Sequence, residues 1–168
     1  MSKTKKTNKI QLEPVPEVGK EYHFWDDGKG SASRHYICRC ERVLPYKEAK
    51  NIKFTLKEYL PPYTKDSEYK EYDTNLAKIW KDAVKHYHWL YAEDTDYFVE
   101  VSCPTYDENT LWAARTKWGG WFTMDIQTSW QGGDIDVTGE KFNKIIEELE
   151  DEGNYDYIEG YKEATYDK

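Results

Sequence analysis

The chain has no apolar run approaching the roughly 18 residues that a membrane-spanning helix needs. Its N-terminus reads MSKTKKTNKI, which is basic but lacks the apolar stretch of a secretory signal. Cysteine is scarce, with three in 168 residues. Cys38 and Cys40 lie two apart on one face of an expected strand, an arrangement that rarely forms a disulfide. We therefore expect a reduced, intracellular protein.

Motifs that hold metals and phosphates are also missing from the sequence. No Gly-x-x-x-x-Gly-Lys loop is present. His35, Cys38 and Cys40 form a single H-x-x-C-x-C spacing without the second half that structural zinc requires. His86 and His88 are two apart on an expected helix and so point to different sides. We expect no metal site and no cofactor.

The sequence carries little that marks an enzyme. Cys103 precedes Pro104 at a strand end, but its alternation with Val99 and Val101 is that of a core residue. Carboxylates are so numerous, in DDG (26–28), AEDTD (92–96) and GGDID (132–136), that an acid pair is expected by chance. We therefore expect a non-catalytic protein and keep a carboxylate-dependent hydrolase as the lesser alternative.

Aromatic residues are what the chain has in abundance. Phe, Trp and Tyr make up 16% of the chain, although apolar residues reach only 38%. A chain of this length can bury a single core without disulfides or metal, and aromatics must supply much of it. Fifteen tyrosines are too many to bury, so some hydroxyls must lie at the surface or at an interface.

The net charge of −8 conceals an uneven distribution of charge. Residues 1–90 carry 18 Lys and Arg against 13 Asp and Glu, whereas residues 91–168 carry 6 against 19. Such segregation creates a one-signed field that attracts cationic partners and repels nucleic acid. The competing interpretation is that the acids simply keep an aromatic-rich protein soluble.

The order of secondary structure predicts an α+β fold. Period-two alternation indicates strands at 20–25, 34–44, 52–56, 97–103, 111–117 and 121–127, and helical spacing indicates helices from about 76 to 91 and from 139 to 151. Asp73 and Gly153 are placed to cap the first helix and to end the second. We expect an antiparallel sheet or small barrel of about six strands with two helices packed on one side. Residues 1–17 should form a disordered basic tail, 18–153 a single domain, and 154–168 an acidic, tyrosine-rich tail.

The stretch KWGGW (117–121) predicts a hairpin between two strands. A three-residue loop, 118–120, would pair Thr116 with Phe122, Ala114 with Met124 and Trp112 with Ile126, which puts apolar residues on one face. In this register Trp118 lies on an exposed tip. Trp121 lies on the face away from the core, beside Lys117, where its ring can stack against a cation.

The C-terminal end of the second expected helix is acidic, which is unfavourable for the helix dipole. Its last turn and the next residues read EELEDE (147–152), five carboxylates where the helix dipole favours cations. Each such carboxylate costs about 0.3–1 kcal/mol of helix stability at low salt. Five acids in this unfavourable position indicate either a functional role or surface charges that solvent and salt screen well.

Two blocks of the chain resemble small accessory proteins of phages and mobile elements in gut bacteria. These blocks are VGKEYHFWDDGKGSASRHYICRCERVLPYKEAK and WLYAEDTDYFVEVSCPTYDENTLWAARTKWGGWFTMDIQTSWQGGDIDVTG, within residues 18–139. Some proteins of this kind are anti-CRISPR proteins that inhibit Cas9. The resemblance implies a binding protein in the cytoplasm of a bacterial host.

The acids and the resemblance together predict an inhibitor that mimics nucleic acid and binds a basic protein such as a CRISPR effector nuclease. The alternative is an aromatic module that binds nucleic acid or carbohydrate through Trp118, Trp121 and Trp130. Direct nucleic-acid binding is the less favoured of the two because the second half is acidic, and membrane binding is not expected. The candidate partner-binding residues are Glu93, Asp94, Asp96, Asp107, Glu108, Trp118, Trp130, Asp134, Asp136, Glu147, Glu148, Glu150, Asp151 and Glu152.

Overall fold

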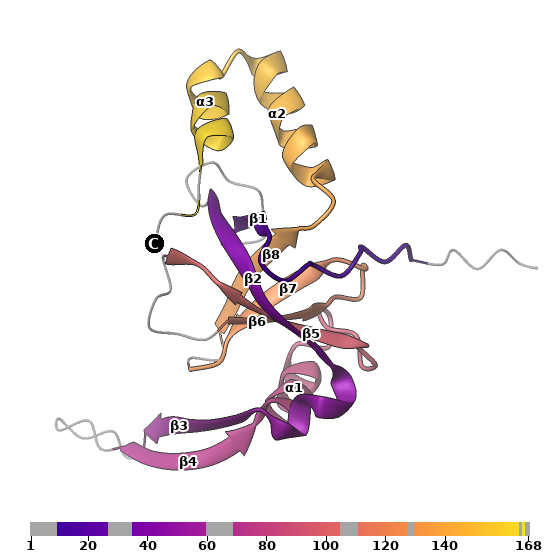
Figure 1. The fold of residues 1–168 in the computed structure, drawn as a ribbon, viewed down its shortest axis with the longest axis vertical. Coiled ribbons are helices and arrows are strands. Elements are labelled where there is room, and N and C mark those ends of the chain that lie inside the picture. The colour runs from indigo at the N-terminus through magenta and orange to yellow at the C-terminus, as the bar shows by residue number, and fades with distance from the viewer. Residues whose placement is uncertain are drawn as a thin grey trace, which may run out of the picture.

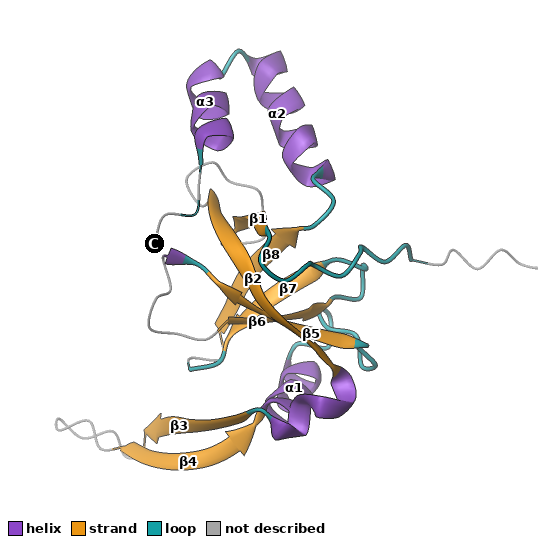
Figure 2. Ribbon diagram, in the orientation of Figure 1, coloured by secondary structure: helices purple, strands orange, loops and turns teal. Residues whose placement is uncertain are grey.

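Antiparallel strands close into a barrel at the centre of the molecule (Figures 1 and 2). The computed structural model describes residues 10–26, 35–59, 69–104, 111–127, 130–164 and 166. The barrel strands are β1 (Glu21–Trp25), β2 (His35–Pro45), β5 (Tyr97–Ser102), β6 (Leu111–Arg115), β7 (Trp121–Asp125) and β8 (Trp130–Asp136). Each pairs with the next, and β1 pairs with β8 to close the ring. The α+β fold class with a small six-stranded antiparallel barrel is therefore confirmed. The expected strand at 52–56 nevertheless lies outside the barrel, in a separate two-stranded sheet, and β8, which the sequence did not predict, is the sixth barrel strand.

One hydrophobic cluster draws side chains from all the barrel strands and so fills the barrel interior. Its buried members are Phe24, Cys38, Cys40, Val99, Val101, Cys103, Leu111, Ala113, Trp121 and Ile135. The intervening residues of the same strands point outward, because side chains alternate along a strand. Many of these are buried too, so both faces of β6 and β7 are covered.

The connection between β2 and β5 supplies one of the covers. It contains the 3-10 helix η2 (Tyr46–Asn51), the hairpin β3 (Lys53–Tyr59) and β4 (Tyr69–Asn75), and α1 (Leu76–His86). The buried side of α1 packs on the outer face of β5–β7, against Phe98, Trp112 and Phe122 among others. Residues 69–75 form a strand that the alternation pattern did not predict, and Asn75, not the expected Asp73, caps the helix. The side chain of Asn75 accepts a hydrogen bond from the Lys78 N–H (3.0 Å).

The second cover is a pair of helices at the opposite end of the molecule from α1 (Figure 1). Helix α2 (Glu140–Glu152) ends at Gly153, whose positive φ of 74° makes the turn that the sequence predicts. Helix α3 (Tyr155–Glu163) then folds back beside α2, and both pack over Trp25 through Ile146, Ile158 and Tyr161. Residues 155–163 are thus helical, where the sequence analysis assigned only a tail.

Residues 10–17 differ most from the sequence-based expectation of a disordered tail. They lie along the barrel, where Pro16 is buried and the Glu13 N–H donates to the carbonyl of Gly119 (2.9 Å). Residues 1–9, the remainder of the expected tail, are outside the described part of the chain.

The hairpin between β6 and β7 has a different register from the one expected. Ala114 pairs with Phe122 rather than Met124, and Arg115 pairs with Trp121. Residues 116–120 form a wider loop in which the Thr116 N–H donates to the carbonyl of Gly120 (2.7 Å). The register is displaced by two residues, which leaves every side chain on its expected face. Trp121 nevertheless is not directed away from the core, because its face of β7 lines the barrel interior and the residue is 1% exposed.

Candidate functional site

The helical pair α2–α3 carries the densest concentration of carboxylates in the described part of the chain. Residues 140–163 contain nine Asp and Glu against three Lys and no Arg. The last turn of α2 contains no basic residue. Five predicted contact residues are all exposed on this helix: Glu147, Glu148, Glu150, Asp151 and Glu152.

The axial spacing of these carboxylates resembles that of charge on a nucleic acid. A helix rises 1.5 Å per residue, so five acids from Glu147 to Glu152 span about 7.5 Å, or one charge per ~1.5 Å. Duplex DNA carries one charge per ~1.7 Å of its axis. The carboxylates surround the end of α2, however, whereas phosphates follow two strands. The match is therefore one of local charge density, not of outline.

The start of α2 is held to the barrel by two of the other predicted acids. Both carboxylate oxygens of Asp136 accept backbone N–H groups, from Lys141 (3.3 Å) and Phe142 (2.8 Å). Asp134 forms an ion pair with the ammonium of Lys141 (3.0 Å). Asp136 is only 4% exposed. Its assignment as a partner contact is therefore corrected to a structural role in capping α2, which orients the acidic helix.

The described acids of residues 93–96 do not join this surface. Glu93 and Asp94 are exposed in a turn before β5, next to η2 and α1, and Asp96 forms an ion pair with Arg115 (3.1 Å). Asp107 and Glu108 lie outside the described residues. The predicted acids that the structure describes thus separate into two groups at different ends of the molecule.

The tryptophans separate in a similar way. Trp118 is 61% exposed on its loop tip, as expected. Trp89, which no sequence pattern singled out, is 53% exposed, and its ring centroid lies 6.4 Å from that of Trp118. Trp121 is buried, and Trp130 opens β8 with its side chain outside the described part of the structure. Trp89 falls inside the helix that was expected to reach residue 91, whereas α1 ends at His86 and Trp89 lies in the turn that follows.

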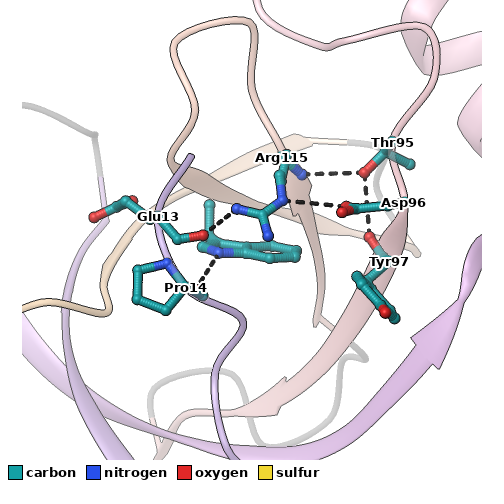
Figure 3. Close-up of polar contacts among 7 residues, drawn as sticks. Glu13, Pro14, Thr95, Asp96, Tyr97 and Arg115 are labelled. Carbon is teal, nitrogen blue, oxygen red and sulfur yellow. Dashed lines mark hydrogen bonds and ion pairs between the residues drawn. The ribbon is translucent and has the colours of Figure 1, made fainter. Parts of the chain in front are cut away.

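A buried arginine fastens the N-terminal segment to the barrel (Figure 3). The Arg115 guanidinium donates to the carbonyl of Glu13 and to the Asp96 carboxylate, and it lies 4.7 Å above the ring of Trp121. The Trp121 indole N–H donates to the carbonyl of Pro14 (3.0 Å). The expected cation stacking on Trp121 is thus real, but Arg115 supplies it rather than Lys117.

The side chain of Glu13 occupies an unfavourable environment for a carboxylate. Desolvation by burial and the nearby negative charge of Asp136 are the main causes that raise its pKa from 4.5 to about 7. Asp134 and Glu140 act in the same direction, and a hydrogen bond from the Trp121 backbone N–H partly opposes them. Glu13 therefore titrates near neutral pH.

His23 and His35 form a second titratable pair, beneath α2 and α3. Their rings are joined by an Nδ1–Nε2 hydrogen bond of 2.7 Å, and Phe142 stacks on His23 at 3.9 Å. Burial lowers the pKa of His23, and burial together with His23 lowers the pKa of His35 to about 4. Neutral imidazoles packed between aromatic rings serve as core residues of this interface.

The cysteines are buried in the barrel interior, where burial raises the pKa of the Cys38 thiol and raises that of Cys40 to about 11. Such thiols are protonated and unreactive at neutral pH. Among the residues that the structure describes, no group of three or more His, Cys, Asp or Glu is placed to hold a metal ion.

In the same part of the chain, no helix combines the length and the apolar character that crossing a membrane requires. Comparison of the chain with protein-family models, with curated proteins and with solved structures gave no match.

Proposed function

We propose that the chain is a non-catalytic, acidic inhibitor that binds a nucleic-acid-handling defence enzyme in the cytoplasm of a bacterial host. The α2–α3 pair is the contact surface, and its carboxylates take the place of phosphates in a cationic channel. The observation that carries the proposal is the exposed carboxylate cluster at the end of α2, at a density close to that of duplex DNA.

The way this cluster is supported is consistent with a contact surface. Five acids at the negative end of a helix dipole cost stability, and no basic side chain in the last turn offsets them. The helix is held at its other end by the buried Asp136 and by the Lys141–Asp134 ion pair. An acidic surface on a fixed helix needs less ordering on binding than an acidic tail would.

Exposed aromatic side chains accompany the acids on this helical pair. Tyr155 is 63% exposed and Tyr157 is 55% exposed, at the start of α3. Tyrosine is enriched at protein interfaces because it offers a large apolar ring and a polar hydroxyl. The surface therefore fits a protein channel lined with Arg and Lys, in which carboxylates pair with the cations and tyrosines add contact area.

The nature of the target follows from the resemblance to phage accessory proteins, some of which are anti-CRISPR proteins. A Cas9-type nuclease has a positively charged channel for its heteroduplex and an arginine pair that reads the PAM. Occupation of either by carboxylates would block target DNA.

The test measures binding to a Cas9 effector complex and inhibition of DNA cleavage. Reversing Glu147, Glu148 and Asp151 to lysine should weaken binding by about tenfold or more and make it less sensitive to salt. The matched control reverses Glu48, Glu58 and Glu71, which lie at the other end of the molecule and give the same change in net charge. The control should bind like the unmodified chain.

Two results would overturn the proposal. One is equal weakening by both triple variants, because net charge alone would then explain binding. The other is capture of no nucleic-acid-handling protein by the unmodified chain, from a bacterial lysate or from the purified Cas9 complex.

A further inference from the structure

Two basic–aromatic dipeptides lie side by side at the end of the barrel near α1. They are His88-Trp89, in the turn after α1, and Lys117-Trp118, in the loop between β6 and β7. The Lys117 N–H donates to the carbonyl of Leu90 (3.1 Å), and Tyr91 pairs with Thr116, so the barrel framework holds the two segments together. The two indole rings are 53% and 61% exposed, and their planes are inclined at 53°.

A cavity of about 370 Å³ opens beside the turn that carries His88. Its lining includes Tyr46, Trp80, Lys81, Lys85, His88 and Glu93. Lys81 and Lys85 are one helical turn apart on the exposed side of α1, and His88 belongs both to the cavity and to the first dipeptide. Most of the polar groups in this lining are hydrogen-bond donors.

One of the lining side chains, the indole of Trp80, contains a buried polar group. It lines the cavity, and its N–H is buried without a hydrogen-bond partner among the described residues. A buried donor that is left unpaired destabilises the fold.

We propose that this surface binds single-stranded nucleic acid. Bases stack on the indoles of Trp89 and Trp118, which accept any base because every base has a flat face. The phosphates lie against Lys81, Lys85 and Lys117, and His88 adds an imidazole donor between the cavity and the indoles. Exposed aromatic rings interleaved with cations are the usual composition of such sites.

The net negative charge of the chain does not prevent this site from binding phosphates, because most of the acids and this group of lysines lie at different ends of the molecule. The described parts of residues 46–86, which cover this end, contain eight Lys against five Asp and Glu. The nine acids of α2–α3 lie across the barrel (Figure 1). At physiological ionic strength an exposed charge acts over a Debye length of about 8 Å, so the acidic helices have little effect here. The local acids are Glu93, Asp94, Asp82 on the exposed side of α1 and Glu13 beside Gly120, and they limit how many phosphates the surface can accept.

Stacking and charge distinguish this ligand from others. A sugar would need hydrogen-bond acceptors as well as donors beside the ring faces, and the cavity lining supplies mainly donors. A partner protein that inserted an apolar side chain between the indoles would bind without a dependence on phosphate, so failure of an oligonucleotide to bind would point to that occupant instead.

The experiment measures binding of a fluorescent oligothymidylate to the full chain at several salt concentrations. We expect a Kd in the range of about 10⁻⁴–10⁻⁶ M and a slope of log K against log salt near −2, about −0.7 for each of three lysine contacts. The double variant Trp89→Ala, Trp118→Ala should lose about tenfold or more in affinity with the slope retained. Its control is Tyr155→Ala, Tyr157→Ala, which removes two equally exposed rings from α3.

The lysines are tested by the variant Lys81→Gln, Lys85→Gln, which should make the slope shallower by about 1.4. Lys144→Gln, Lys162→Gln causes the same change in net charge on α2 and α3 and should leave both affinity and slope unchanged. Absence of binding at low salt would overturn the proposal. So would binding that the α2–α3 lysine variant weakens as much as the α1 variant, or binding that the tryptophan variant leaves intact.

Discussion

Replacing Glu13 by glutamine should stabilise the folded protein above pH 7 and have no effect below pH 4.5. In the unfolded chain the carboxyl group has its ordinary pKa of 4.5, and in the folded protein its pKa is about 7. Between these values the unfolded state releases a proton that the folded state keeps. The free energy of unfolding therefore falls as the pH rises through this interval. Glutamine is close in shape, remains neutral, and still accepts the hydrogen bond from the Trp121 backbone N–H.

The size of the effect follows from the pKa interval and from the exposure of the side chain. One pH unit corresponds to about 1.36 kcal/mol, so the interval of about 2.5 would give about 3.4 kcal/mol if the group were fully shielded. Glu13 is only about half-buried, and solvent screening reduces this to about 1–2 kcal/mol. For a chain of this length the gain corresponds to about 3–6 °C in Tm.

Urea unfolding at a series of pH values, from below 4.5 to above 7, measures the difference directly. Glu17→Gln is the matched control, because Glu17 lies in the same segment but forms an exposed ion pair with Lys20. Its effect should be small throughout. A Glu13→Gln variant less stable than the parent above pH 7, or offset from it by the same amount at every pH, would refute the reasoning.

Other predictions concern buried groups. Arg115→Ala should destabilise the protein by about 2–4 kcal/mol in urea unfolding, because it removes the charged hydrogen bonds to the Glu13 carbonyl and the Asp96 carboxylate. Arg115→Lys should be nearly as unstable, because one ammonium group cannot bridge both of these partners. Asp136→Ala should cost about 1–2 kcal/mol and speed amide hydrogen exchange chiefly in α2, whereas a uniform increase across the barrel would contradict a capping role. Cys38, Cys40 and Cys103 should react with a thiol reagent only as fast as the protein opens, and immediate labelling of the native state would show that burial does not protect them.

The alternation of apolar residues predicted which face each side chain of β6 and β7 occupies, but not which residues pair. A displacement of two residues preserves every face, so the pairings of Ala114 with Met124 and with Phe122 satisfy the pattern equally well. The observed register also depends on the loop, where Gly119 has a φ of 93° and an added Cβ would lie 2.5 Å from the carbonyl of Gln11. That neighbour is more than a hundred residues away in the chain, and no local pattern reveals it.

The burial of both faces of β6 and β7 is the second feature that could not be predicted from the sequence. Alternation predicted that Trp121 and Phe122 lie on different faces of β7, and they do. The face that carries Trp121, however, lines the interior of a closed barrel and is not exposed to solvent. In β1 the neighbours Phe24 and Trp25 are likewise both buried, one inside the barrel and one under α2 and α3. Closure is a property of the whole sheet, so a single hairpin cannot predict it.

For the candidate site, the sequence identified the exposed acids of α2 but not their separation from Glu93 and Asp94. In the composition, the acids of α2 and the acids Glu93 and Asp94 belong to the same acidic half of the chain. Their separation arises because the 91–96 segment follows α1 directly, whereas α2 begins only after β8 has crossed the barrel. The pairing of Trp89 with Trp118 could not be predicted for a similar reason, because the two residues come from loops that are distant in sequence.

The pairing of β1 with β8 has a consequence for the order in which the protein is made. It joins residues 23–25 to 134–136, so the ring cannot close until about four-fifths of the chain has left the ribosome. Until then β1 and β7 each present an unpaired edge to the cell, and such edges recruit strands from other chains. A contact this distant in sequence also slows folding, since the loop must close before the pairing stabilises it. Truncation before Asp134 should therefore leave an aggregating barrel with two open edges, while removal of α2 and α3 leaves the ring itself complete.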